Sequence, residues 1–192
     1  MHNGRIDFGG EKMSKSLGNV KRAVDLLGEY GGNTVRFVLI NSYYRTPVNF
    51  SDELLLSAKK ELDKINQTYS RLSIKIQLSN ESVFSYQGEL DLDGFVKALC
   101  DDLNTPNALT EMYRVIKLAN VSLRSNPLDI DKLKVYYFTL KEMFDYLGLV
   151  FDEVILTDED KKLFDDYNIA KANKDFAKSD EIRNKLIQRK LL

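Results

Sequence analysis

Cysteine and histidine are almost missing from this sequence. Its 192 residues include one of each, Cys100 and His2. A single cysteine cannot form an internal disulfide, which favours a reducing compartment, and we expect a cytoplasmic protein. Two such residues cannot build a Cys/His zinc site, and no Ser/His/Asp hydrolase arrangement is present. Cys100 lies in an apolar run, so we expect it packed in the core, and we expect His2 to be an exposed end residue.

Long apolar runs and an excess of one charge are absent too. No run approaches the roughly 20 apolar residues of a membrane span, so we expect no membrane partner. The first residues, Met-His-Asn-Gly, lack the character of a secretory signal. The chain has 28 basic and 29 acidic residues and a net charge of −1. This balance excludes no class of partner, because a nucleic-acid-binding protein can gather its basic residues on one face.

One short stretch carries most of the chemical information. Residues 9–19 read Gly-Gly-Glu-Lys-Met-Ser-Lys-Ser-Leu-Gly-Asn, with two lysines and two hydroxyls in residues 12–16. Glycines permit the backbone angles of a mobile loop, so we expect residues 9–19 to be more mobile than the helices behind them. Paired ammonium groups on such a loop suit a polyphosphate, because they neutralise charge that develops on a leaving group. The plain alternative is a solvated basic turn.

Apolar residues recur at helical spacing in three segments, which predicts a mainly α fold with a helical bundle. The first segment follows Ser51, a good N-cap residue. The stripes are Leu55, Ala58, Leu62, Ile65, Tyr69, Leu72 and Ile76; Leu109, Met112, Ile116, Ala119 and Leu123; and Leu133, Tyr136, Leu140, Met143 and Leu147. Gly148 should end the third helix. Thr105 should cap the second, with Pro106 in its first position.

Shorter elements are expected on both sides of this bundle. Before it, the pattern predicts an extended piece at residues 5–8, a helix from Asn19 to about Gly28, a helix at 34–42 capped by Asn33, and a connector at 43–50. Between the bundle helices, we expect a loop at 77–90 and a helix at 91–103. After the bundle, acidic residues following Thr157 predict a helix start. The basic residues that would share one face of a continuous helix over 168–190 are Lys171, Lys174, Lys178, Lys185 and Arg189. Such a stripe could contact phosphates or be an ordinary solvated face.

Several stretches together resemble one family, the cysteinyl-tRNA synthetases. Lys-Met-Ser-Lys-Ser at residues 12–16 resembles the second signature motif of class I aminoacyl-tRNA synthetases. The other resembling stretches are residues 1–4 with the end of the catalytic half, 35–37 and 44–51 with the stem-contact segment, 101–109 with the start of a DALR-type helical domain, and 170–183 with its late helical stretch. The cysteine–glucosaminyl-inositol ligases also resemble the catalytic half, but the helical tail fits them less well.

The resemblance implies the C-terminal part of a cysteine–tRNA ligase, which activates cysteine with ATP and transfers it to tRNA(Cys). It implies that residues 1–50 end the catalytic region, that residues 51–150 form a tRNA-binding bundle of the DALR type, and that residues 151–192 form a C-terminal helical segment. The family's His-Ile-Gly-His-type motif and zinc ligands are not in this chain and would lie upstream of Met1. We therefore expect the chain to need an N-terminal catalytic half and to be inactive alone.

The resemblance also implies the roles of particular residues. Lys12, Met13, Ser14, Lys15 and Ser16 would bind ATP, which carries Mg²⁺, and Lys15 with Lys12 second would be catalytic. The residues expected to contact tRNA are Tyr44, Arg45, Lys171, Lys174 and Lys178. The alternative from another class is a non-catalytic helical RNA-binding or interaction module with a vestigial loop.

Overall fold

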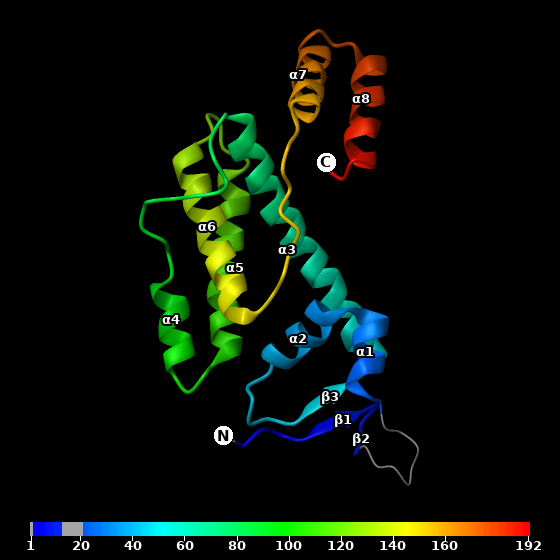
Figure 1. The fold of residues 1–192 in the computed structure, drawn as a ribbon, viewed down its shortest axis with the longest axis vertical. Helices are drawn as coiled ribbons and strands as arrows, with labels where there is room; N and C mark the ends of the chain where they lie inside the picture. The colour runs from blue at the N-terminus through cyan, green and yellow to red at the C-terminus, as the bar shows by residue number, and fades with distance from the viewer. Residues whose placement is uncertain (1, 13–20) are drawn as a thin grey trace.

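The computed structural model describes residues 2–12 and 21–192, and within them the fold is mainly helical, as expected. A helical bundle occupies the middle of the molecule (Figure 1). A small sheet with two short helices lies at one end, beside the N-terminus, and a pair of antiparallel helices lies at the other. No helix among the described residues is long and apolar enough to cross a membrane.

The sheet has three short strands in the order β2-β1-β3. These are β1 (Ile6–Phe8), β2 (Glu11–Lys12) and β3 (Val48–Phe50). β1 pairs antiparallel with β2 and parallel with β3, with Ile6 opposite Val48 and Phe8 opposite Phe50. The extended piece at 5–8 is confirmed. The expectation of a plain connector at 43–50 is wrong for β3, whose pairing partner lies about 40 residues earlier in the chain.

Helices α1 (Ala23–Tyr30) and α2 (Gly32–Ile40) begin and end elsewhere than predicted. The predicted start of α1 at Asn19 lies outside the described residues, and the helix runs on through Gly28 to Tyr30. Asn33 does not cap α2, because it lies in the first turn. Its side-chain amide instead makes two hydrogen bonds to the backbone of Val150. Asn33 Nδ2 donates to the Val150 carbonyl at 2.5 Å, and Asn33 Oδ1 accepts from the Val150 N–H at 3.0 Å. This contact ties α2 to the segment that leaves the bundle.

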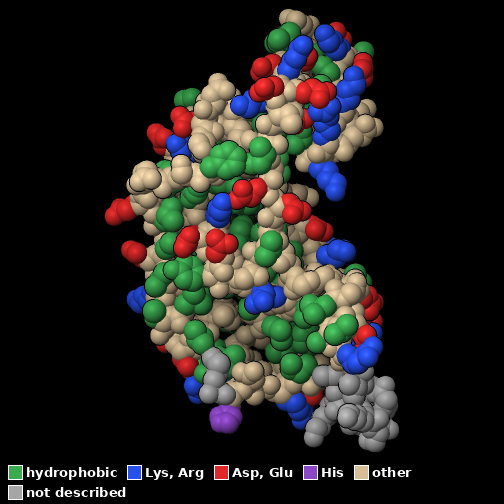
Figure 2. All heavy atoms as spheres, in the orientation of Figure 1, with side chains coloured by type: hydrophobic (Ala, Val, Ile, Leu, Met, Phe, Trp, Pro, Cys, Tyr) green, Lys and Arg blue, Asp and Glu red, His purple; other side chains and the backbone are tan. Residues whose placement is uncertain are grey.

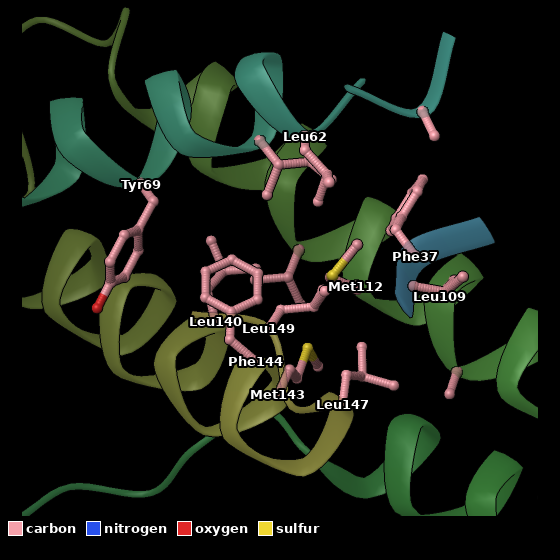
Figure 3. Close-up of a cluster of buried hydrophobic side chains, with 14 of the residues drawn as sticks. Phe37, Leu62, Tyr69, Leu109, Met112, Leu140, Met143, Phe144, Leu147 and Leu149 are labelled. Carbon is pink, nitrogen blue, oxygen red and sulfur yellow. The ribbon is translucent and has the colours of Figure 1, made fainter. Parts of the chain in front are cut away.

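The bundle consists of α3 (Asp52–Leu78), α4 (Asp93–Cys100), α5 (Thr105–Ser122) and α6 (Ile130–Leu147). Ser51 caps α3 as predicted, its Oγ accepting from the backbone N–H of Leu54 at 3.1 Å. All seven residues of the predicted α3 stripe are buried, as are all five of the α6 stripe and four of the five on α5. Figure 3 shows side chains from α2, α3, α5 and α6 pointing into this common core. Gly148 ends α6 in the left-handed conformation, with φ of 66°.

Three expectations for the α4 region need correction. The helix spans residues 93–100 rather than 91–103. Cys100 is exposed, not packed in the core. Phe95 on α4 is fully buried, and five residues at 100° each turn Cys100 well away from that face. The cap of α5 is Asn104 rather than Thr105, since the Asn104 Oδ1 accepts from the N–H of Asn107 at 3.2 Å.

The C-terminal segment is a helical hairpin of α7 (Asp158–Ala172) and α8 (Phe176–Gln188). Thr157 and Asp160 form a capping box at the start of α7, as the acidic helix start predicted. The two helices are separate, because residues 173–175 form a turn between them in which Lys174 has a left-handed φ of 57°. The hairpin packs on the end of α3 through a second apolar cluster of Ile74, Leu156, Phe164, Ile182, Leu186 and Leu191.

Candidate functional site

The phosphate-loop motif continues directly from the β1–β2 hairpin. The turn of this hairpin is Gly9-Gly10, with φ of 63° and 87°, which is the left-handed geometry that tight two-residue hairpins require. Gly9 N–H donates to the Phe50 carbonyl at 2.9 Å, and Gly10 N–H donates to Asn49 Oδ1 at 2.9 Å. β3 therefore holds the turn from one side. Asn49 was not singled out from the sequence, although it lies in a stretch that resembles the family.

The motif itself is only partly within the described residues. Lys12 lies in β2, where its Cα is paired with that of Asp7. The other expected ATP-binding residues, Met13, Ser14, Lys15 and Ser16, lie outside the described residues. The expectation of a mobile loop at 9–19 falls largely on the same residues and stays a prediction.

A close backbone approach joins the entry of β1 to the segment before β3. Gly4 N–H donates to the Tyr44 carbonyl at 2.7 Å, and Val48 N–H donates to the Arg5 carbonyl at 2.8 Å. A Cβ on Gly4 would lie 2.0 Å from the carbonyl oxygen of Thr46. Only glycine fits this contact, so Gly4 is a structural requirement of the hairpin that carries the motif.

Tyr44 and Arg45, the expected tRNA contacts near the sheet, meet Asp102 at the junction between α4 and α5. Arg45 Nη2 lies 2.9 Å from the Asp102 carboxylate, and the hydroxyl of Tyr44 donates to Asp102 Oδ1 at 3.0 Å. The hydroxyl of Tyr43 also donates to this carboxylate. Arg45 Nε in turn donates to the Tyr44 hydroxyl at 2.7 Å. We call these four residues the Asp102 cluster.

The electrostatics of the Asp102 cluster follow from these bonds. Hydrogen bonds from Tyr43 and Tyr44, with the charge of Arg45, hold the pKa of Asp102 below its ordinary range. The same carboxylate raises the pKa of Tyr43 to about 12. At neutral pH the cluster therefore contains an ionised carboxylate beside a guanidinium and the neutral phenol of Tyr43.

The remaining expected tRNA contacts, Lys171, Lys174 and Lys178, are exposed at the turn of the α7–α8 hairpin. They surround the turn rather than forming one helical stripe. The other two members of the expected stripe pair with acids: Lys185 Nζ lies 2.7 Å from Glu181, and Arg189 bonds Glu159 and Asp160. Figure 2 shows basic side chains gathered on this hairpin among acidic ones. The hairpin and the Asp102 cluster lie at opposite ends of the molecule (Figure 1).

Metal ligands do not come together in the described part of the chain. Within residues 2–12 and 21–192, no group of three or more His, Cys, Asp or Glu side chains is placed to hold a metal ion. His2 is exposed at the N-terminus, as expected.

Two family models match separate parts of the chain. Residues 1–60, which hold the sheet and the phosphate-loop motif, match tRNA synthetases class I (C) catalytic domain, and residues 94–152, from α4 to the end of the bundle, match the DALR domain. Together these matches indicate part of a class I aminoacyl-tRNA synthetase that carries a DALR-type helical domain.

The whole chain is 37% identical over 198 residues to proteins named Cysteine--tRNA ligase. Examples are those of Bacillus thuringiensis (strain Al Hakam), Bacillus cereus (strain AH820) and Bacillus anthracis (strain A0248). The chain belongs to the cysteinyl-tRNA synthetase family. The alignment covers 100% of this chain and 43% of each relative, so the chain spans about two fifths of their length.

Proposed function

We propose that this chain is the part of a cysteine–tRNA ligase that supplies the ATP-phosphate loop and the tRNA-binding helices. The observation that carries the proposal is the continuous similarity to proteins of that name, with Lys-Met-Ser-Lys-Ser placed directly after an anchored hairpin. The complete ligase would activate cysteine with ATP and transfer it to tRNA(Cys) in the cytoplasm. The N-terminal catalytic half would supply the rest of the nucleotide site.

In the activation step, the carboxylate of cysteine attacks the α-phosphate of ATP, and pyrophosphate leaves. Lys15, and Lys12 to a lesser degree, would stabilise the negative charge on the departing phosphates, which Mg²⁺ accompanies. This is electrostatic positioning, because neither lysine forms a covalent bond. Losing one such contact typically costs on the order of 3–4 kcal/mol of transition-state stabilisation. The zinc of the family has no ligand set among the described residues, so we assign these residues no role in binding it.

We divide the chain by role as the sequence suggests. Residues 1–50 would complete the catalytic region, residues 51–150 would form the tRNA-binding bundle, and residues 151–192 would extend the contact with tRNA. The second boundary is supported by the second apolar cluster, whose members, apart from Ile74 on α3, lie after residue 150. The first boundary is supported by Ser51, which caps α3 directly after β3.

The test of this function is cysteine-dependent ATP–pyrophosphate exchange by the complete polypeptide that carries this chain. We expect Lys15→Ala to lower the maximal rate by on the order of 10²–10³ with little change in cysteine binding, and Lys12→Ala to do so less strongly. Lys60→Ala, at an exposed position on α3, is the matched control and should leave the rate unchanged. An unchanged maximal rate in Lys15→Ala, with only the cysteine KM raised, would show that the loop serves a different substrate.

A second test concerns the lysines at the α7–α8 turn. If Lys178 contacts a tRNA phosphate, Lys178→Ala should weaken tRNA binding and reduce the slope of log affinity against log salt by about one. Filter binding at several salt concentrations measures both. Lys185→Ala, whose ammonium group on the same hairpin is already paired with Glu181 at 2.7 Å, should keep the wild-type slope. An unchanged slope in Lys178→Ala would remove Lys178 from the interface.

A further inference from the structure

The Asp102 cluster joins the two parts of the chain that the family models separate. Tyr43, Tyr44 and Arg45 lie within residues 1–60, whereas Asp102 lies within residues 94–152. The hydrogen bonds between them span 58 or 59 positions in sequence. The cluster is therefore a tertiary attachment of the loop after α2 to the junction of α4 and α5.

The backbone at this junction is held in an unusual conformation. Asp102 and Leu103 have φ of 52° and 54°, and neither residue is glycine. Side chains other than glycine, asparagine and aspartate rarely adopt this left-handed region, so the backbone strain lies at Leu103, directly after Asp102. Such strain persists where surrounding contacts over-determine it, and it concentrates at functional positions. Here the three bonds to the Asp102 carboxylate fix the orientation of the Asp102 side chain.

An ordinary surface ion pair would not need this arrangement. A single exposed pair contributes little and leaves both long side chains mobile. Asp102 instead accepts from two hydroxyls and a guanidinium, and Arg45 is also bonded to Tyr44. Each of the two expected tRNA contacts near the sheet is thus held by more than one bond, which lowers the entropy lost when a ligand binds.

We propose that Asp102 is a positioning residue for tRNA: its carboxylate holds Tyr44 and Arg45 in the orientation in which they contact the RNA. This inference rests on the proposed function of the chain as part of a cysteine–tRNA ligase. Asp102 does not itself contact the RNA, and its negative charge opposes a phosphate. Its effect is exerted through the side chains that it orients. The activation step proposed above involves no tRNA, so we expect exchange to change little when the Asp102 carboxylate is removed.

For Asp102→Asn, the positioning proposal and simple electrostatics predict opposite changes in tRNA affinity. Asp102→Asn removes a negative charge near the RNA, which by electrostatics alone strengthens tRNA binding. If Asp102 positions Arg45 and Tyr44, the same change weakens it. Asp101→Asn is the matched control, because this exposed neighbour carries the same charge and has no bond to residues 43–45 among the described contacts.

The experiment measures exchange and aminoacylation of a tRNA(Cys) transcript by the complete polypeptide. We expect Asp102→Asn to raise the KM for tRNA about tenfold and to keep exchange within about twofold of wild type, since a lost bond to a charged group has roughly this effect. Asp101→Asn should leave the KM unchanged or lower it. In a double-mutant cycle, Arg45→Ala should add little to Asp102→Asn, because Arg45 is then no longer held.

Asp102→Gly removes the whole side chain without opposing the left-handed backbone at this position. Glycine accepts the left-handed conformation, so this variant should unfold no more readily than Asp102→Asn, yet it should show the same rise in the KM for tRNA. A wild-type KM in Asp102→Gly, or tighter tRNA binding in Asp102→Asn, overturns the positioning role while the ligase function stands. Absence of cysteine-dependent exchange in the wild-type polypeptide overturns the proposed function and this inference with it.

Discussion

Replacing Gly4 by alanine should weaken the small sheet that carries the phosphate-loop motif. The new Cβ would lie 2.0 Å from the Thr46 carbonyl oxygen and 2.3 Å from its carbonyl carbon. Both are backbone atoms, so no rotation of a side chain can relieve the overlap. An ordinary contact begins at 3.4 Å, and the two segments must therefore move apart by roughly the difference of 1.4 Å.

The free-energy cost of Gly4→Ala has two parts, the steric overlap itself and the weakening of two neighbouring backbone hydrogen bonds. Overpacking by one methyl group typically costs about 1–3 kcal/mol. The separation also stretches the bond from Gly4 N–H to the Tyr44 carbonyl and that from Val48 N–H to the Arg5 carbonyl, each of which contributes about 0.5–1.5 kcal/mol. We expect Gly4→Ala to destabilise the sheet by about 2–4 kcal/mol, because part of the overlap relaxes.

Gly28→Ala is the matched control with the opposite sign. Gly28 lies within α1, and a Cβ there meets nothing within 4 Å. Alanine in a helix is favoured over glycine by about 0.5–1 kcal/mol, so this variant should be slightly stabilised. Urea unfolding measures the global change, and hydrogen exchange of the Val48 and Gly9 amides measures the sheet. Wild-type exchange rates at these two amides in Gly4→Ala would refute the reasoning.

Two further changes test the C-terminal hairpin. Gln77→Leu should lower the free energy of unfolding by about 1–3 kcal/mol, because the buried N–H of Leu156 loses its acceptor, Gln77 Oε1 at 2.9 Å; urea unfolding should show no such loss for Gln67→Leu, at an exposed position on the same helix. Separately, hydrogen bonds from the Thr157 hydroxyl and from the guanidinium of Arg189, the residue that follows α8, lower the pKa of Asp160. Its carboxylate therefore stabilises the fold above the unfolded-state pKa, and this contribution is lost as the pH falls through the lower folded-state value. Stability measured from pH 6 to 2 should drop less steeply in Asp160→Asn, and an identical pH dependence would contradict the assignment.

The helical part of the fold was predictable because its signal is repeated. On α3, seven apolar residues recur at helical spacing, and all seven are buried. The position at which a helix begins or ends is indicated by only one or two residues, so it is harder to predict than the helix itself. At the start of α5, two adjacent residues are both good caps, and Asn104 rather than Thr105 makes the bond. β3 is three residues long and is stabilised by a strand far away in sequence, so local pattern could not reveal it.

The chemistry assigned to the candidate site stays a prediction, whereas several of the contacts around it could not be predicted from the sequence. Paired lysines between glycines suited a polyphosphate, but the resemblance of Lys-Met-Ser-Lys-Ser to the class I synthetase signature is what favoured phosphate binding over a solvated basic turn. The sequence also pointed to Tyr44 and Arg45, but nothing in it selects Asp102 among 29 acidic residues as their partner. Gly4 and Asn49 were missed for the same reason, since each acts on a backbone segment about 40 residues away. Such pairings depend on the folded topology, which the residue pattern does not encode locally.

Helix α3 sets the distance between the two regions expected to contact tRNA. Its 27 residues, at 1.5 Å each, span roughly 40 Å. Its buried stripe runs from Leu55, in the core beside α2, to Ile76 near the hairpin, so the whole length is fixed by packing. A ligand that touches both the Asp102 cluster and the turn at Lys178 must therefore be extended over tens of ångströms. A nucleotide or an amino acid is far too small for this, whereas a folded RNA can satisfy it, and contacts so far apart should contribute independently to its affinity.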